Sequence, residues 1–274
     1  MILSRIQYFG QGQIARNHQV LRHWLRRFWK HSGKLRYGLA RGLRSYECFG
    51  LPRLHPPALS LEEQFYLAQD FRGKIIYDVG AHNGMLAMYF ARAAGPAGQV
   101  VAWEPLADTF RSLEANLRLN RFENVLALPI ALGEREERRE FYFCSAAAAS
   151  GTVTGCRPAQ AGVDLRAGEA QVETLDGARQ RRSLPPPDWI KIDVEGMEAE
   201  VLAGARETLR RYHPQLVVEM HGIGVEAKLA NARRVLSMLH WLGYRCRHIE
   251  TRAEITLGDA GRILHGHLHA STPP

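Results

Sequence analysis

The stretch that decides the fold is IIYDV at Ile75–Val79, followed directly by GAHNG from Gly80 to Gly84. Its first half is largely apolar, which is typical of a parallel strand buried on both faces. Its two glycines permit positive φ and a close approach of the backbone to a neighbouring group. Since residues 85–94 have a helical composition, the turn would set the free amides of a helix N-terminus beside the strand end. We therefore predict that this turn binds an electron-rich ligand, most simply the carboxylate of an amino-acid cofactor.

The glycine spacing G-x-x-x-G leaves two alternatives open. Dinucleotide enzymes bind pyrophosphate with a tighter G-x-G-x-x-G set, which is not present in this turn. A nicotinamide-dependent oxidoreductase is further disfavoured because the sequence contains no Tyr-x-x-x-Lys pair. The second alternative is a tight strand-to-helix turn that binds nothing.

Outward from this stretch, short apolar runs alternate with helical stretches. Further strands are predicted at residues 99–103, 124–130, 189–193 and 215–220, and helices at 106–120, 197–212 and 227–242. Strands that alternate with helices at this spacing indicate an α/β fold with a mostly parallel sheet covered on both faces.

Two later segments depart from the alternation. Residues 134–176 are predicted to form a β insertion, with strands at 140–144 and 171–174. Residues 244–250 and 263–269 are predicted to pair as strands at an antiparallel C-terminal edge of the sheet. Three histidines, at positions 265, 267 and 269, would share one face of the last strand, which we interpret as a solvated edge rather than a metal site.

The N-terminal quarter differs in composition from the rest. Residues 1–74 hold 13 Lys and Arg against 4 Asp and Glu, whereas residues 75–274 hold 23 against 24. A Pro-rich stretch at 51–57 precedes a predicted helix at 59–69, which begins with a capping box of Ser60 and Glu63. We therefore predict a basic helical extension over residues 1–58 and one catalytic domain over residues 59–274.

An amphipathic helix is predicted at residues 14–31. Between Leu21 and Lys30 its apolar side carries Trp and Phe, and its other side carries mainly Arg. Peripheral contact with an anionic membrane surface is one interpretation, and packing against the catalytic domain or a second subunit is the other. Nucleic acid is not expected as a partner, because the rest of the chain has no basic surplus. Without an apolar run of about 20 residues or a secretory signal, a cytoplasmic location is expected.

Acidic residues follow several of the predicted strands. Glu104 comes directly after strand 99–103, where its carboxylate could accept hydrogen bonds from both hydroxyls of a ribose. The alternative for Glu104 is a carboxylate that stabilises the N-terminus of the next helix. Ala131 lies just past the third strand, where contacts to an adenine edge would fall.

The densest cluster follows the strand at 189–193. Lys191 interrupts its apolar pattern, and Asp193 and Glu195 fall at its carboxyl end, at the rim where open α/β sheets bind ligands. One strand later, Glu219 and His221 share a face. These side chains could therefore converge beside the reactive group of a cofactor. The alternatives are a structural histidine at His221 and carboxylates that cap the helix starting near Met197.

The chain from about Lys74 to His221 resembles the FkbM-type family of S-adenosylmethionine (SAM)-dependent methyltransferases. The stretches that carry the resemblance are DVGAHNG from Asp78, WEP around Glu104, IALG from Ile130, ETLD from Glu173, DWIKIDVEGMEAEVLAG from Asp188, and VEMH ending at His221. The resemblance implies a Rossmann-like class I methyltransferase fold and methyl transfer from SAM to a hydroxyl of a sugar, natural product or glycolipid-like acceptor. The residues predicted to bind SAM are Asp78, Gly80, His82, Asn83, Gly84, Glu104 and Ala131.

Methyl transfer from a sulfonium needs an aligned acceptor and removal of its proton. We assign His221 as the general base, because a neutral imidazole is available near pH 7. Asp193 and Glu195 are predicted to be catalytic as well, by orienting the acceptor or by accepting the proton. No metal-ligand set is assigned, although both carboxylates could also bind a divalent cation through oxygen. A non-catalytic SAM-binding module is the remaining alternative, and the presence of Asp193, Glu195 and His221 argues against it.

Overall fold

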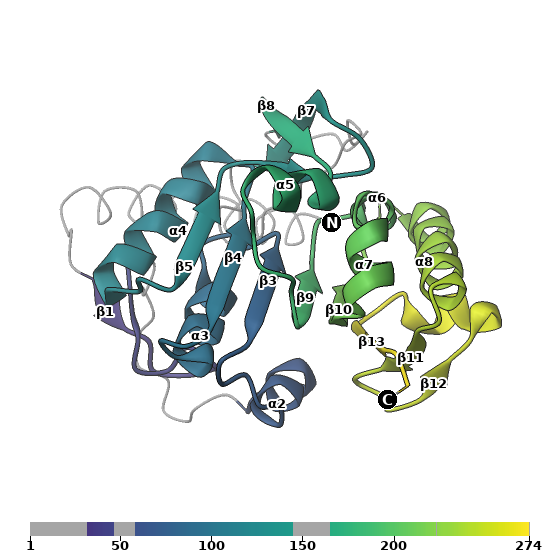
Figure 1. Cartoon of the computed structure of the whole chain (residues 1–274), viewed down its shortest axis with the longest axis horizontal. Helices are drawn as coiled ribbons and strands as arrows, with labels where there is room; N and C mark the ends of the chain where they lie inside the picture. Colours follow the sequence, from purple (N-terminus) through teal and green to yellow (C-terminus); the bar gives the residue numbers. More distant parts are fainter. Residues whose placement is uncertain (1–31, 47–57, 145–164, 223, 274) are drawn as a thin grey trace, which may run out of the picture.

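The computed structural model describes residues 32–46, 58–144, 165–222 and 224–273. Their core is an eight-stranded sheet in the order β12-β11-β13-β10-β9-β3-β4-β5 (Figure 1). The five neighbouring strands β10, β9, β3, β4 and β5 run parallel to one another. Strand β13 is antiparallel to both β10 and β11. The strands are β3 (Ile75–Val79), β4 (Gln99–Trp103), β5 (Val125–Leu128), β9 (Trp189–Ile192), β10 (Gln215–Glu219), β11 (Arg245–His248), β12 (Glu254–Ile255) and β13 (His267–Ser271).

Helices cover both faces of the sheet. The side chains of Ile76 and Val100 pack on one face with residues of α2 (Leu61–Leu67), α3 (Met85–Ala94) and α4 (Ala107–Asn120). Those of Tyr77 and Val101 pack on the other face with residues of α5 (Leu175–Arg181), α6 (Glu198–Gly204), α7 (Arg206–Tyr212) and α8 (Gly224–Trp241). This alternation along each strand follows from the two-residue period of an extended backbone. The predicted Rossmann-like architecture with a mostly parallel sheet is therefore confirmed.

The predicted β insertion is also confirmed. Its strands β7 (Glu137–Cys144) and β8 (Leu165–Glu173) pair antiparallel, and β6 (Ala131–Leu132) adds to β8 in a separate three-stranded sheet. Phe141 and Val172 pack there against Met197, which follows β9. The insertion is therefore anchored beside the carboxyl ends of the central strands.

The single helix predicted at 197–212 is wrong, because two helices, α6 and α7, meet at Ala205. Asp176 accepts hydrogen bonds from the backbone amides of Glu207 and Thr208 and from the Thr208 hydroxyl. This carboxylate belongs to α5 and caps the start of α7 from outside. A contact between distant segments therefore starts a new helix in a stretch whose composition is helical throughout.

The predicted antiparallel C-terminal edge of the sheet is confirmed, but the order of its strands differs from the expectation. β11 and β13 pair antiparallel as expected, but β13 lies between β10 and β11, so that the edge strand is β12. The strand predicted at 263–269 begins only at His267, and residue 263 is the last residue of the 3₁₀ helix η2 (Leu257–Ile263). His267 and His269 therefore lie on an inner strand and are not on a solvated edge.

The described part of the N-terminal extension is not helical. Residues 32–46 form a hairpin of β1 (Gly33–Lys34) and β2 (Arg44–Ser45). Asn120 of α4 accepts a hydrogen bond from Arg44 N and donates one to Arg44 O, so the hairpin is fastened to α4. The amphipathic helix predicted at 14–31, with its proposed membrane contact between Leu21 and Lys30, lies outside the described residues. None of the described helices is both long and apolar enough to span a bilayer.

Candidate active site

A cavity opens at the carboxyl ends of the central strands. Its lining comes from the turn after β3, the end of β4, the β6 and β7 strands, and the loop after β9. The lining residues are Val79, Gly80, His82, Trp103, Glu104, Pro105, Ile130, Ala131, Leu132, Phe141, Asp193, Val194, Glu195 and Met197. The glycine turn, the acid after β4 and the two carboxylates after β9 therefore face one cavity.

The glycines of the turn are required by packing between chain segments. Gly80 has a φ of +82°, and a Cβ atom there would lie 1.8 Å from the backbone oxygen of Asp193. Gly84 has a φ of +85°, and its Cβ would lie 2.4 Å from Leu113 Cδ1 of α4. From the sequence we expected both glycines to allow a ligand to approach the backbone. In the structure, the atom that an added Cβ would meet belongs at both positions to another segment of the protein.

Replacing Gly80 by alanine is expected to lower the free energy of unfolding by about 2–4 kcal/mol. The left-handed backbone costs an L-residue about 1–2 kcal/mol, and the clash with Asp193 adds overpacking strain. Gly73 is a matched control, because it has a φ of +70° and open space where its Cβ would be. Chemical denaturation of both variants separates the two effects, and equal losses for Gly80→Ala and Gly73→Ala would show that the clash is absent.

Glu104 has its carboxylate fixed by the backbone. It is 5% exposed, and its two oxygens accept hydrogen bonds from His82 N at 3.0 Å and Leu106 N at 2.9 Å. Burial raises the pKa of Glu104 to about 7, against the lowering effect of these two amides. Each oxygen retains a second lone pair, so the carboxylate can still accept from a bound hydroxyl.

The predicted cofactor residues divide into two groups. Gly80, His82, Glu104 and Ala131 line the cavity, whereas Asp78, Asn83 and Gly84 are not among its lining residues. Asp78 is fully buried, and neither carboxylate oxygen accepts a hydrogen bond from the described residues. The backbone oxygen of Asn83 accepts a hydrogen bond from Asn116 on α4.

Lys191, noted in the sequence as an interruption of a strand, connects the turn to the rim. Its buried Nζ lies 3.4 Å from Asp78 Oδ1 and 3.2 Å from Asp193 Oδ2, and it donates to Gly80 O at 3.2 Å. Burial lowers the pKa of Lys191, but the carboxylates of Asp193 and Asp78 outweigh it and raise that pKa above its ordinary value. Lys191 is therefore a buried ammonium shared by two carboxylates.

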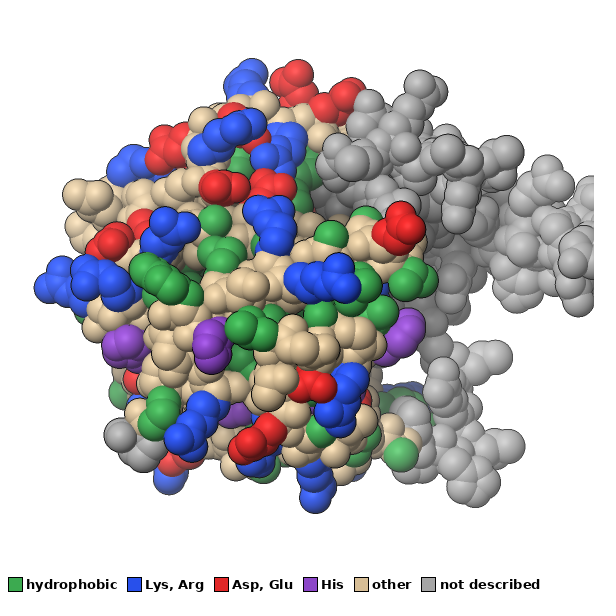
Figure 2. Space-filling model, turned by 90° about the vertical axis from the view of Figure 1, so that its right-hand side faces the viewer, with side chains coloured by type: hydrophobic (Ala, Val, Ile, Leu, Met, Phe, Trp, Pro, Cys, Tyr) green, Lys and Arg blue, Asp and Glu red, His purple; other side chains and the backbone are tan. Residues whose placement is uncertain are grey.

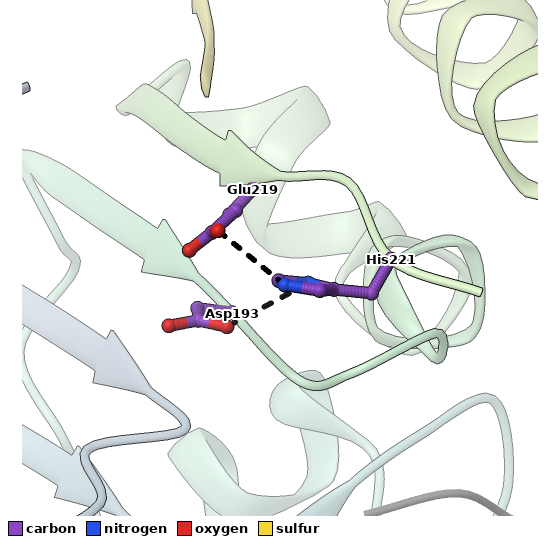
Figure 3. A group of neighbouring side chains, drawn as sticks. All are labelled: Asp193, Glu219 and His221. Atoms are coloured by element: carbon purple, nitrogen blue, oxygen red, sulfur yellow. Dashed lines mark ion pairs between the residues drawn. The ribbon is translucent and has the colours of Figure 1, made fainter. Parts of the chain in front are cut away.

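His221 lies among four carboxylates, which come from the loop after β9, the start of α6 and the end of β10. Its Nδ1 is 3.3 Å from Glu198 and 3.7 Å from Asp193, and its Nε2 is 3.4 Å from Glu219 and 3.8 Å from Glu195. Figure 3 shows the imidazole between Asp193 and Glu219. Burial lowers the pKa of His221, but the surrounding carboxylates raise it to about 10. These carboxylates disfavour the neutral imidazole that was the reason for assigning His221 as the base, and that assignment stays a prediction.

Glu195 presents its carboxylate to the cavity from a strained backbone. Its φ is +56°, a left-handed conformation that is uncommon for a residue with a side chain. Burial raises the pKa of Glu195 to about 7, although the positive charge of His221 opposes this. Strained backbone is often found at functional sites, where the surrounding structure holds it in place.

Some residues at this rim were not found from the sequence. Glu198 is fully buried and holds His221, while His267 of β13 contacts Glu62, Glu219 and Glu250 at 3.4, 3.5 and 2.7 Å. The pairing of Glu219 with His267 across β10 and β13 explains their proximity. Glu62 reaches the same place from α2, and no pattern in the sequence around it indicates this.

Comparison with known proteins places these features in a family. The model of the methyltransferase FkbM domain matches residues 78–246, more than half of the chain. The hexuronic acid methyltransferase AglP of Haloferax volcanii is 30% identical over 155 residues, which are 56% of this chain and 58% of AglP. The AMB antimetabolite synthetase AmbE of Pseudomonas aeruginosa is 30% identical over 177 residues, 54% of this chain but 8% of AmbE. The chain therefore spans less than two thirds of the length of either relative.

Solved structures similar to this chain include methyltransferases. The FkbM methyltransferase of Methylobacillus flagellatus aligns with a TM-score of 0.47 and 19% identity, covering 74% of this chain and 45% of that one. Cofactor-bound Rv0187 from MTB aligns with a TM-score of 0.47 and 17% identity, covering 81% and 83%. Because the family model matches more than half of the chain, the chain belongs to the FkbM family of SAM-dependent methyltransferases.

Proposed function

We propose that this SAM-dependent methyltransferase transfers the methyl group to a hydroxyl of a small acceptor, such as a sugar, a natural product or a glycolipid-like molecule. The observation that carries the proposal is that one cavity is lined by Glu104 as well as by Asp193 and Glu195. Carboxylates at this position can accept the proton that a hydroxyl loses on methylation. The name of AglP, a hexuronic acid methyltransferase, supports a sugar acceptor. Family membership removes the nicotinamide-dependent oxidoreductase from consideration.

The residues around the cavity fit SAM, the cofactor of the family. A buried carboxylate at Glu104, with a free lone pair on each oxygen, suits the two hydroxyls of a ribose. Ala131 and the apolar Ile130 and Leu132 provide an apolar wall suited to an adenine. SAM supplies an activated methyl group on its sulfonium, so the protein has to orient the acceptor and take up its proton.

We assign the proton acceptor to Glu195 and the orientation of the acceptor to Asp193. Both side chains line the cavity, but Asp193 is already held by Lys191 at 3.2 Å, whereas no lysine or arginine is ion-paired with Glu195 among the described residues. His221, as an imidazolium, would position these carboxylates instead of acting as the base. The catalytic domain is proposed to extend over residues 59–274, with residues 1–58 as an extension.

An acceptor screen tests the proposed reaction. Release of S-adenosylhomocysteine is measured with pairs of compounds that differ in one hydroxyl, such as a hexoside and its deoxy analogue, and each product is analysed by mass spectrometry. We expect turnover with the hydroxylated member and a methyl group on oxygen. A methyl group found on nitrogen, carbon or sulfur would contradict the proposal.

Glu104→Ala is expected to weaken SAM binding by about 1–3 kcal/mol, because the ribose hydroxyls lose a buried charged acceptor. The carboxylate form accepts these bonds and the ligand-free pKa is about 7, so protonation competes with SAM as the pH falls. Lys191 and Asp78, the charged groups that act on Glu104, have opposite effects on its pKa. Affinity of the native protein should therefore fall up to about tenfold per pH unit below pH 7.

Calorimetry at pH 6 and pH 8 checks this prediction. The Glu104→Ala variant serves as its own control, because any pH effect from SAM or from other residues remains in it. The difference in affinity between the native protein and the variant should be larger at pH 8. A difference that is the same at both pH values would show that Glu104 does not bind the ribose as a carboxylate.

A further inference from the structure

The surroundings of His221 have an unusual composition, because one imidazole faces four carboxylates on both of its nitrogens. Glu198 is fully buried and accepts hydrogen bonds from Gly196 N at 3.0 Å and from Asn231 Nδ2. A carboxylate held in this way can only accept, so the nearby Nδ1 of His221 carries a proton. This arrangement fixes the imidazole with its Nε2 directed at Glu219 and Glu195, which also offer only acceptor atoms.

A buried carboxylate that orients the far nitrogen of a histidine is the usual outer support of a metal-bound imidazole. The ligand atoms of Asp193, Glu219 and His221 all lie within 4.8 Å of one another (Figure 3). We propose that these three residues, of which Asp193 lines the cavity, bind a divalent cation beside it. Two carboxylates and one imidazole suit Mn²⁺ or a similar metal, with the remaining positions open to water or acceptor oxygens.

The charge balance around the site is a second argument for a bound cation. Asp78 is fully buried, accepts no hydrogen bond from the described residues, and shares the ammonium of Lys191 with Asp193. His267 is likewise shared by Glu219, Glu62 and Glu250. Together, seven carboxylates are connected to four basic side chains by ion pairs among the described residues: Glu62, Asp78, Asp193, Glu195, Glu198, Glu219 and Glu250 with Lys191, His221, His248 and His267.

With all seven carboxylates ionised, full positive charge on all four basic groups would still leave three negative charges in a partly buried region. Such an excess is unfavourable without further counter-charge. A divalent cation at Asp193, Glu219 and His221 would take the place of the Nε2 proton of His221 and would reduce this excess by one charge. It would also explain how an acid-rich rim can bind an oxygen-rich acceptor, because the metal would attract hydroxyl or carboxylate oxygens that the carboxylates repel.

This inference rests on the proposed function, in which Asp193 and Glu195 face the acceptor. An acceptor hydroxyl on the cation would lose its proton more readily, and Glu195 beside it would take up that proton. The bond from the methyl carbon to the sulfonium breaks as the bond to the acceptor oxygen forms. The cation itself is unchanged by the reaction, so no further reagent is needed.

The experiment uses the full chain, Mn²⁺ as the probe and no acceptor. Calorimetry is expected to show one Mn²⁺ per chain, and pulsed electron paramagnetic resonance is expected to show coupling of the bound Mn²⁺ to a histidine nitrogen. Glu219→Gln and His221→Gln should weaken Mn²⁺ binding about tenfold or more. Glu250→Gln is the matched control, because it removes a carboxylate of the same ion-pair network outside the three ligands, and it should change affinity by less than about threefold.

The native protein alone can overturn the proposal, by binding no stoichiometric Mn²⁺ or by showing no nitrogen coupling. An equal loss of affinity in Glu250→Gln and Glu219→Gln would also overturn it, since general electrostatics would then explain the binding. SAM binding is measured on the same samples. SAM binding without Mn²⁺ binding removes the metal site and keeps the cofactor assignment, whereas an intact Mn²⁺ site in a protein without O-methylation refutes only the proposed function.

Discussion

Replacing Lys191 by methionine is expected to lower the free energy of unfolding by about 3–5 kcal/mol at pH 7, because it leaves buried carboxylates without a counter-charge. Lys191 and Asp78 have side chains that are 8% and 0% exposed, and their ion pair is 3.4 Å long. Asp78 accepts no hydrogen bond from the described residues, so nothing else there offsets its charge. Denaturant titration of the native protein and the variant measures the loss.

A second substitution tests the cause. In Lys191→Met combined with Asp78→Asn, the buried charge is removed together with its partner, and much of the lost stability should return. Lys74→Met is the matched control, because Lys74 pairs with Asp188 at 3.1 Å but both side chains are partly exposed, at 43% and 36%. Its loss should stay within about 1 kcal/mol. If Asp78→Asn restores nothing, the buried charge is not the reason that Lys191 is needed.

Glu195→Gln is expected to reduce turnover by about 10²–10⁴-fold with the acceptor that the screen identifies. Glutamine keeps the shape of the side chain but cannot take up a proton from the acceptor. SAM binding should change little, because Glu195 is assigned to the acceptor and not to SAM, and calorimetry can verify this. The loss would then fall on the chemical step and not on cofactor binding.

Glu207→Gln is the control for this variant. Glu207 lies on α7, its side chain is 67% exposed, and within the described part of the chain Arg210, at 3.0 Å, is its one ion-pair partner. The Glu207→Gln substitution should leave turnover unchanged. Native turnover in Glu195→Gln would remove this residue as the proton acceptor, and a parallel loss in Asp193→Asn would then point to Asp193.

The acid-rich rim also bears on the choice of acceptor. Figure 2 shows Lys and Arg interspersed with Asp and Glu over the face that it presents, without a single dominant sign. The concentration of negative charge is instead internal, around His221 and His267. If the proposed cation is bound there, it would offset this negative charge where an anionic acceptor enters the site.

The sequence by itself determined where the central strands and helices lie and which edge of the sheet carries the site. Ile75–Val79, Met85–Ala94 and Gln99–Trp103 have the bounds predicted from their apolar patterns, because a buried parallel strand and its following helix need a distinct local composition. The carboxyl ends of parallel strands share one edge of a sheet, so Gly80, Glu104, Asp193 and Glu195 could be expected at one site, and they line one cavity.

Only the tertiary structure decided what depends on contacts between distant segments. The break at Ala205 comes from a carboxylate on α5, and the place of β13 inside the sheet comes from its pairing with both β10 and β11. The protonation of His221 is determined by carboxylates from the loop after β9, α6 and β10, whose fields add only when the folded chain brings them within 4 Å. Local sequence sets backbone preference and burial, but the pKa of a side chain depends on the charges around it in space.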